Sequence, residues 1–315
     1  MYREKIKVLD CTIRDGGLIN NHYFTDAFVR EVYKALSASG IDYMEFGYRN
    51  SRDLFPPSDY GEWKYCDDDK IREIIDGVES ELKISIMVDA HRVKDQQFAP
   101  ADESPVDMIR VATYVKDMDK AIALVNRSHD LGYETTVNIM AISKEIEPDM
   151  IEALDQLAKS PVDVVYVVDS YGALYCEQIE YLVKLFRKHL PESKEIGIHC
   201  HNNQQLAFSN TIEAIIHNAN YLDASLYGIG RGPGNCCLEL LMGFLKNPKF
   251  KLSPILKIIE EQMLPMQKDI EWGYLIPYMI TGILNEHPRA GIAMRKTKDK
   301  DKYAKFYEEI REMVG

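Results

Sequence analysis

Two patterns of hydrophobic and polar positions alternate along the chain. Short, nearly continuous apolar runs rich in β-branched residues recur eight times, and longer segments with apolar residues at helical spacing lie between them. We expect strands within 6–13, 42–48, 83–90, 107–114, 134–142, 163–170, 196–200 and 221–228. Amphipathic helices are expected over 26–40, 118–132, 148–160, 177–190 and 203–219. Apolar strands that alternate with helices are typical of a parallel sheet covered by helices.

Eight such units predict an α/β protein with a (β/α)8 TIM barrel, a fold of about 250 residues. A doubly wound sheet is the alternative, but "RDGGLINN" after the first run lacks the G-x-G-x-x-G phosphate fingerprint. Beyond residue 235 the pattern becomes helical and closes with a charged tail. We therefore expect a catalytic barrel over 1–248 and a C-terminal helical extension over 249–315.

Composition narrows the class of protein. The chain has 315 residues, of which 46% are hydrophobic and 28% charged, and this is ordinary for a globular protein. A formal charge of −12 argues against nucleic acid or an anionic membrane as the main partner. The N-terminus shows no signal peptide, and no apolar run reaches membrane-spanning length. We expect a cytoplasmic protein whose six cysteines are reduced thiols.

The strongest candidate chemistry lies where two predicted strands end. "LDCTIRDGG" (9–17) places Arg14 and Asp15 after the first strand, and "IGIHCHNN" (196–203) places His199 and His201 at the end of the seventh. Histidines spaced by two leave the same face of a strand, and odd-numbered strands contribute to the same interior layer of a barrel. One carboxylate and two imidazoles then bind a divalent cation, and the Arg14 guanidinium faces a developing oxyanion. Alone, either pair has a simpler interpretation, a rim salt bridge or a hydrogen-bonded polar pair.

Further candidates follow other strands. "GIGRGPGN" (228–235) forms either a tight loop that closes the barrel or a backbone cradle for an anionic substrate. In the second case the substrate contacts Gly230, Arg231 and Gly232. Ser170, at the end of the sixth strand, could hydrogen-bond a bound carboxylate or enolate. Two more candidates are Glu45, either a loop anchor or a polar group of the site, and Asn235, a neutral oxygen for the metal.

Taken together, "DCTIRDGG", "HCHNN" and "DASLYGIGRGPGN" resemble the motifs of the DRE-TIM metallolyases, an HMGL-like superfamily, and are closest to its 4-hydroxy-2-oxovalerate aldolase branch. The resemblance covers about residues 9–240. It implies that Asp15, His199 and His201 are metal ligands, with Asn235 as an additional one. It also implies that Arg14 steadies an enolate and that Ser170 lies near the bound keto acid. The expected cofactor is Mn or Mg, with Zn or Co as alternatives.

The sequence also departs from that branch. Leu18 stands where the aldolases have a catalytic histidine, and His22 follows four positions later. The general base is therefore open between His22, Tyr278 and a metal-bound water. The segment 272–291 differs from the helical region through which such aldolases contact a dehydrogenase, so that partner is doubtful. The apolar helices over 252–284 either mediate self-association as a homo-oligomer or only cover the barrel.

These features predict a divalent-metal-dependent aldolase that cleaves a small 4-hydroxy-2-oxo acid through a metal-stabilised pyruvate enolate. Three other functions stay open. The first is a Claisen-type synthase that condenses an acyl-CoA with a 2-oxo acid, although no further synthase domain is evident. The second is a non-haem iron oxygenase, because two histidines and a carboxylate also form a facial triad. The third is a metal-binding barrel without aldolase activity, which Leu18 favours.

Overall fold

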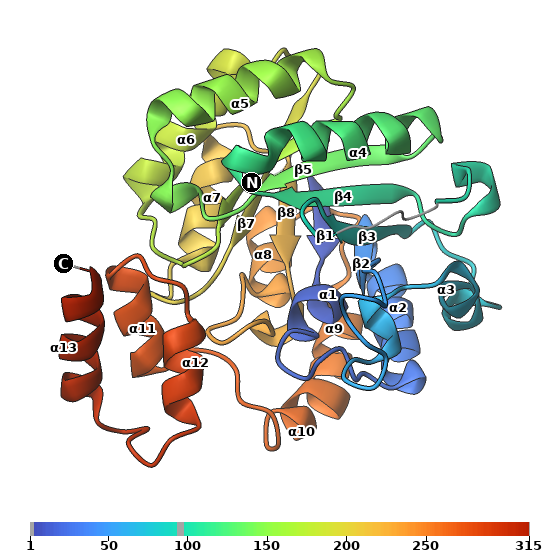
Figure 1. Ribbon diagram of the computed structural model, residues 1–315. Helices are drawn as coiled ribbons and strands as arrows, with labels where there is room; N and C mark the ends of the chain where they lie inside the picture. The colour runs from blue at the N-terminus through green and yellow to red at the C-terminus, as the bar shows by residue number, and fades with distance from the viewer. Residues whose placement is uncertain (1–2, 93–97, 315) are drawn as a thin grey trace.

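Eight parallel strands close into a barrel in chain order, with β8 paired to β1 (Figure 1). The computed structural model describes residues 3–92 and 98–314. The strands are β1 (Lys7–Asp10), β2 (Tyr43–Tyr48), β3 (Lys83–Asp89), β4 (Met108–Thr113), β5 (Glu134–Ile139), β6 (Val164–Asp169), β7 (Glu195–Cys200) and β8 (Tyr221–Ala224). The prediction of a (β/α)8 TIM barrel with a helical C-terminal region is confirmed.

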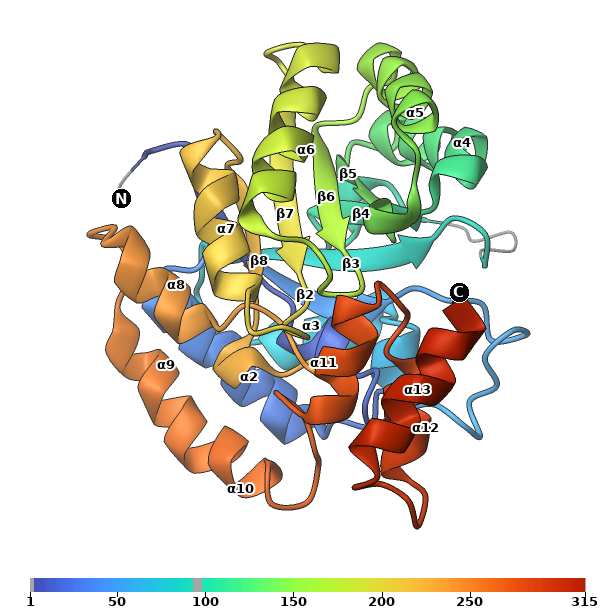
Figure 2. The same ribbon diagram turned by 90° about the vertical axis from the view of Figure 1, so that its left-hand side faces the viewer.

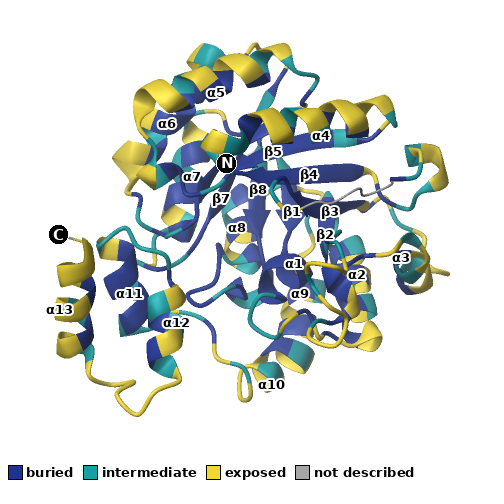
Figure 3. Ribbon diagram, in the orientation of Figure 1, coloured by how far each residue is buried: buried dark blue, intermediate teal, exposed yellow. Residues whose placement is uncertain are grey.

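The larger helices pack outside the barrel, and each turns exposed residues toward solvent (Figures 2 and 3). They are α2 (Asp26–Ser39), α3 (Asp68–Ile75), α4 (Met118–Asp130), α5 (Glu147–Lys159), α6 (Cys176–His189), α7 (Ala207–Ile216) and α8 (Leu238–Leu245). Helix α2 shows how the sequence sets such bounds. The Thr25 side chain accepts the Phe28 N–H at its start, and Gly40 ends it in the left-handed conformation at φ 74°.

Single helical turns occupy many of the loops between strands and helices. They are α1 (Thr12–Gly16), η1 (Glu62–Lys64), η2 (Ala101–Glu103), η3 (Val115–Asp117), η4 (Ile142–Lys144) and η5 (Leu226–Gly228). Several follow directly on the carboxyl end of a strand, the end where TIM barrels carry their sites.

The first strand is shorter than its apolar run. It ends at Asp10, whose carboxylate accepts the Thr12 N–H at 3.0 Å and the Thr12 hydroxyl at 2.7 Å. This local hydrogen bonding competes with strand pairing and starts helix α1. Arg14 and Asp15 therefore lie on a helical turn and not at the strand terminus itself, which corrects the expected extent of this strand.

The C-terminal region has two parts (Figure 2). Helix α9 (Leu252–Ile258) continues through a π-helical turn, η6 (Ile259–Met263), into α10 (Leu264–Met266) and packs along α2. Its apolar residues join the main hydrophobic core. Helices α11 (Ile276–Ile283), α12 (Arg289–Arg295) and α13 (Tyr303–Val314) enclose a small core of their own. The predicted division at residue 248 stays a prediction.

Two further findings bear on composition. All six cysteines are free thiols, as expected. Within the described ranges, none of the helices combines the length and the apolar character that crossing a bilayer requires.

Candidate metal centre

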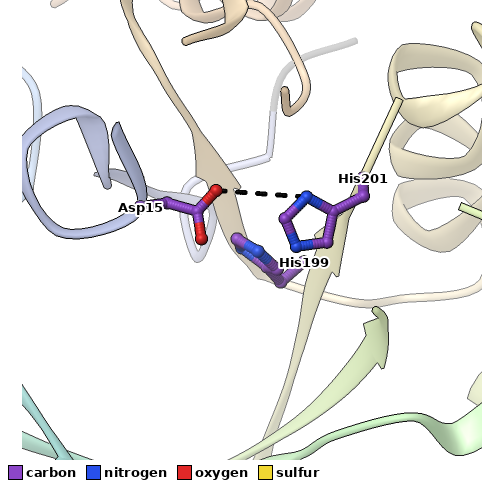
Figure 4. Close-up of side chains that lie close together, drawn as sticks. All are labelled: Asp15, His199 and His201. Carbon is purple, nitrogen blue, oxygen red and sulfur yellow. Dashed lines mark ion pairs between the residues drawn. The ribbon is translucent and has the colours of Figure 1, made fainter. Parts of the chain in front are cut away.

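Asp15, His199 and His201 converge at the carboxyl end of the barrel (Figure 4). Asp15 comes from α1, His199 from β7, and His201 from the residue just beyond β7. One ligand atom from each lies within 4.8 Å of the other two, and all three side chains are buried. Asp15 Oδ2 and His201 Nδ1 are 4.0 Å apart. The structure thus brings together the three residues proposed from the sequence as metal ligands.

The two imidazoles are oriented by hydrogen bonds from one ring nitrogen each. His199 Nδ1 lies 2.9 Å from Asp223 Oδ2, and His201 Nδ1 lies 3.2 Å from the Gly234 carbonyl oxygen. Both partners only accept, so Nδ1 carries the proton in each ring and the other nitrogen keeps its lone pair. Such a bond from the second nitrogen is the usual support of a metal-binding histidine.

The protonation states also suit a cation. Burial alone would raise the pKa of Asp15, but His201, Arg14 and His199 together hold it below its ordinary value. Burial lowers the pKa of His201 well below its ordinary value, and the charge of Asp15 offsets this only in part. An ionised carboxylate beside a neutral imidazole is the state in which these groups bind divalent ions.

Asn235 tests whether the cluster fits an ion. Its Nδ2 donates to Asp15 Oδ2 at 2.8 Å and to the Ile229 carbonyl at 3.0 Å, while its buried Oδ1 has no partner in the described chain. Burying an oxygen that accepts no hydrogen bond destabilises a fold unless another group, such as a cation, binds to its lone pairs. A divalent cation would do so, because amide oxygen, carboxylate and imidazole form a common donor set. The residues therefore fit the cofactor class, and the donor set leaves the choice of metal open.

Gly230 makes this arrangement possible. A Cβ atom on it would lie 2.2 Å from Asn235 Nδ2 and 2.5 Å from Asp15 Oδ2. Residues 201 and 235 also form an isolated antiparallel bridge, which fixes the glycine loop against the end of β7. A glycine at position 230 thus allows the backbone to approach the cluster closely.

A chain of buried charges runs from the cluster across the barrel interior. Arg14 Nη1 contacts Asp15 Oδ1 at 2.7 Å, and Arg14 Nε contacts Glu45 Oε2 at 2.7 Å. Arg110 joins Glu45 Oε2 at 2.9 Å to Asp223 Oδ2 at 2.6 Å, and Asp223 leads back to the β7 histidine. Three carboxylates and two guanidiniums leave one excess negative charge, which a dication would turn into one positive charge.

Arg231 adds a cation beside this chain. Its backbone N–H donates to Asp15 Oδ2 at 3.2 Å, its guanidinium donates to the Ser170 carbonyl at 2.9 Å, and its Nη1 lies 3.3 Å from His287 Nε2. His287 is neutral, because burial first and then Arg231 lower its pKa to about 3. The guanidinium therefore has neutral partners and keeps its charge for an anion. The Ser170 hydroxyl accepts the Ala141 N–H at 2.8 Å.

Three other candidates, Glu45, Tyr278 and His22, lie outside the cluster of Asp15, His199 and His201. Glu45 is fully buried between two arginines, behind Arg14 as seen from the cluster. Tyr278 packs near Gly232, whose Cβ would lie 3.3 Å from its ring. Burial raises the pKa of Tyr278 to about 12, and its charged neighbours are Glu271 and Arg295, not the cluster.

His22 is buried against the end of α1. A Cβ on Gly17 would lie 2.1 Å from His22 Nδ1, so the ring covers that glycine. Neither ring nitrogen has a partner among the described residues. Burial, with Lys64 and Arg14, lowers the pKa of His22 well below its ordinary value. His22 is thus a neutral imidazole next to the turn that carries Arg14 and Asp15.

Sequence reasoning did not identify Arg110 and Asp223 as parts of the site. A signal was present for each, because Arg110 interrupts an apolar strand pattern and Asp223 interrupts the last one. A charge inside a buried strand requires a partner of opposite sign. The pattern does not reveal which partner that is.

The chain belongs to the HMGL-like family, whose model matches residues 5–260. This confirms the resemblance and the class of enzyme, a carbon–carbon lyase. A protein named oxaloacetate decarboxylase from Mycobacterium tuberculosis is 31% identical over 78% of this chain and 71% of its own length. A protein named 4-hydroxy-2-oxovalerate aldolase from Bacillus cereus is 26% identical over 86% of this chain and 80% of its own. The N-terminal domain of a putative aldolase from Bacteroides vulgatus superposes with TM-score 0.78 at 28% identity, over 95% of this chain and all of that one.

Proposed function

We propose that this protein is a divalent-metal-dependent aldolase that cleaves a small 4-hydroxy-2-oxo acid to pyruvate and an aldehyde. The observation that carries the proposal is the buried cluster of Asp15, His199 and His201 with the Arg14 guanidinium bonded to it. The relatives named 4-hydroxy-2-oxovalerate aldolase support the substrate class.

The residues divide the chemistry between them. A cation held by Asp15, His199 and His201, with Asn235 Oδ1, would supply a Lewis acid for the 2-oxo acid end of the substrate. Arg14 is fixed by two carboxylates, so its guanidinium stabilises the negative charge that develops on the enolate oxygen without reorganising.

Retro-aldol cleavage also requires that a base removes the proton of the 4-hydroxyl group. Leu18, at the histidine position of the aldolase pattern, cannot do this. His22 is the nearest imidazole to α1 outside the cluster among the residues the structure describes, and it is neutral and unpartnered. We assign it as the first candidate for the base.

Leu18 also favours a second candidate function, decarboxylation of oxaloacetate. Loss of carbon dioxide from this 2-oxo acid leaves the same enolate but needs no proton taken from a hydroxyl group. The 31% identical relative named oxaloacetate decarboxylase points the same way.

Pyruvate release separates these functions. The purified protein, stripped with a chelator and reloaded with Mn²⁺, is given 4-hydroxy-2-oxopentanoate or oxaloacetate, and pyruvate, acetaldehyde and carbon dioxide are measured. We expect acetaldehyde and pyruvate in equal amounts, loss of activity on chelation, and loss in His199→Ala but not in His129→Ala, an exposed histidine of α4. Carbon dioxide from oxaloacetate alone supports decarboxylation instead. The proposal is overturned if pyruvate is released from both substrates without a metal, or if neither substrate yields pyruvate.

A further inference from the structure

Lys64 is a buried cation that the proposed chemistry does not use. It lies at the end of η1, in the loop after β2, and only 5% of the residue is exposed. Its Nζ lies 4.7 Å from the ring centroid of Tyr48, 4.4 Å from that of Phe55 and 5.2 Å from that of Tyr60. No hydrogen bond or ion pair from Nζ reaches any residue of 3–92 or 98–314. Aromatic faces stabilise an ammonium but accept none of its three N–H groups as a carboxylate would.

Asp89 influences this charge but forms no ion pair with it. Asp89 lies at the end of β3, where its Oδ1 lies 3.0 Å from His91 Nδ1 and its Oδ2 lies 3.5 Å from Arg92 Nε. Burying a charge without a bonded counterion is costly, and a cation held in this way is a candidate functional group.

Lys64 adjoins the metal centre through two other unpartnered polar groups. The Tyr48 ring, which Lys64 faces, meets the His22 ring edge-on at 5.5 Å between centroids. His22 in turn covers Gly17, two residues after Asp15. Both nitrogens of His22 are buried and unpartnered, and the Tyr48 hydroxyl has no partner in the described chain. One cation and one neutral donor thus lie next to His22 and the turn that carries Arg14.

We propose that Lys64 and the Tyr48 hydroxyl form a subsite for a second carboxylate, at the end of the substrate remote from the 2-oxo acid. The inference rests on the proposed function and predicts that, within its substrate class, 2-oxo acids with a second carboxylate are preferred over 2-oxo monocarboxylates. The charge count favours a carboxylate over a phosphate group, since Lys64 is a single cation without an ion pair in the described part of the chain and Arg92 is already paired with Asp89.

Binding of an unreactive pair of ligands tests the subsite. Titration calorimetry on the Mn²⁺-loaded protein compares 2-oxopentanedioate with 2-oxopentanoate, which have the same chain length and differ in the terminal carboxylate. We expect the dicarboxylate to bind ~10–100-fold more tightly, as for hydrogen bonds to a charged group. Lys64→Met, which keeps an unbranched side chain of similar length, should abolish the difference. Tyr48→Phe, which keeps the ring, should reduce it several-fold.

Lys83→Met is the matched control. Lys83 also lies over a tyrosine ring, at 5.5 Å from Tyr43, but at the start of β3 and therefore at the opposite end of the barrel. Lys83→Met should leave the preference for 2-oxopentanedioate unchanged. Equal binding of the two ligands by the unmodified protein overturns the subsite without needing any variant, and so does a preference that survives Lys64→Met. A preference for the dicarboxylate together with no pyruvate from any 4-hydroxy-2-oxo acid or from oxaloacetate supports the subsite and refutes the proposed function.

Discussion

The carboxylate behind His199 gives the sharpest test of how the metal centre is built. Asp223 Oδ2 accepts from His199 Nδ1 at 2.9 Å and from Arg110 Nη2 at 2.6 Å, and the side chain is fully buried. In Asp223→Asn the imidazole loses an anionic partner that fixes its tautomer and raises the basicity of its free nitrogen. Removing such a partner typically weakens metal binding 10–100-fold, which corresponds to about 1.4–2.7 kcal/mol.

The fold should survive this change. Arg110 keeps its contact with Glu45 at 2.9 Å, so the guanidinium is not left without a counterion. The cost to folding is then that of one weakened charged hydrogen bond, about 1–3 kcal/mol, against a total stability of about 5–15 kcal/mol.

Calorimetric titration of the chelator-stripped protein with Mn²⁺ measures the affinity, and urea unfolding measures the stability. Asp163→Asn is the control, because Asp163 also accepts two hydrogen bonds, from the Thr135 N–H at 2.8 Å and its hydroxyl at 3.2 Å, at the other end of the barrel. The expected result is weaker Mn²⁺ binding in Asp223→Asn alone. If Asp223→Asn binds Mn²⁺ within twofold of the unmodified protein, the assignment of His199 as a ligand oriented by Asp223 is refuted.

Three other changes have definite expected outcomes. Gly230→Ala places a Cβ against the Asp15 and Asn235 side chains and should lower both Mn²⁺ affinity and stability. The control is Gly243→Ala in α8, whose Cβ would have nothing within 4 Å and should stabilise the protein by about 0.5–1 kcal/mol in urea unfolding. Burial first and then Arg92 lower the pKa of Lys64 to about 8 in the folded protein. Below pH 8 this lysine is therefore protonated in both the folded and the unfolded protein, and burial of its charge opposes folding in full. From pH 8 to about 10.5 the unfolded chain binds more protons than the native protein, and stability must rise with pH. Lys64→Met should therefore raise the free energy of unfolding, measured in urea at pH 7, by about 1–3 kcal/mol over that of the unmodified protein. This difference in stability should narrow above pH 8, and a difference that does not change with pH would contradict the reasoning. Leu18→His should raise the rate of acetaldehyde release from 4-hydroxy-2-oxopentanoate and leave oxaloacetate decarboxylation unchanged, and equal effects on both rates would show that residue 18 is remote from the 4-hydroxyl group.

The stability cost expected at Lys64 and the orphaned oxygen of Asn235 have a common origin. Both involve a buried side-chain group that has no hydrogen-bonded or ion-paired partner of its own among the described residues, the ammonium of Lys64 and the amide oxygen of Asn235. A fold selected only for stability would replace them by apolar groups. Their presence at the carboxyl end of the barrel is consistent with a metal ion and an anionic substrate completing the site.

The sequence by itself determined the barrel and identified the three residues that the structure brings together as a candidate metal site. Eight apolar runs that alternate with amphipathic segments leave few ways to bury both faces of each strand, and the H-x-H spacing fixes two imidazoles on one face. These are local periodicities, which a single stretch of chain expresses without knowledge of its neighbours.

The tertiary structure decided which distant charges meet. Asp10 ends β1 early and turns Arg14 and Asp15 onto a helix, and Arg110 and Asp223 join across the barrel although 113 positions separate them. Lys64 likewise becomes a buried cation only through tertiary packing, which places three aromatic rings around its ammonium group. A charge can be read from the sequence, but its partner is selected by packing between remote segments, and no local pattern encodes that choice.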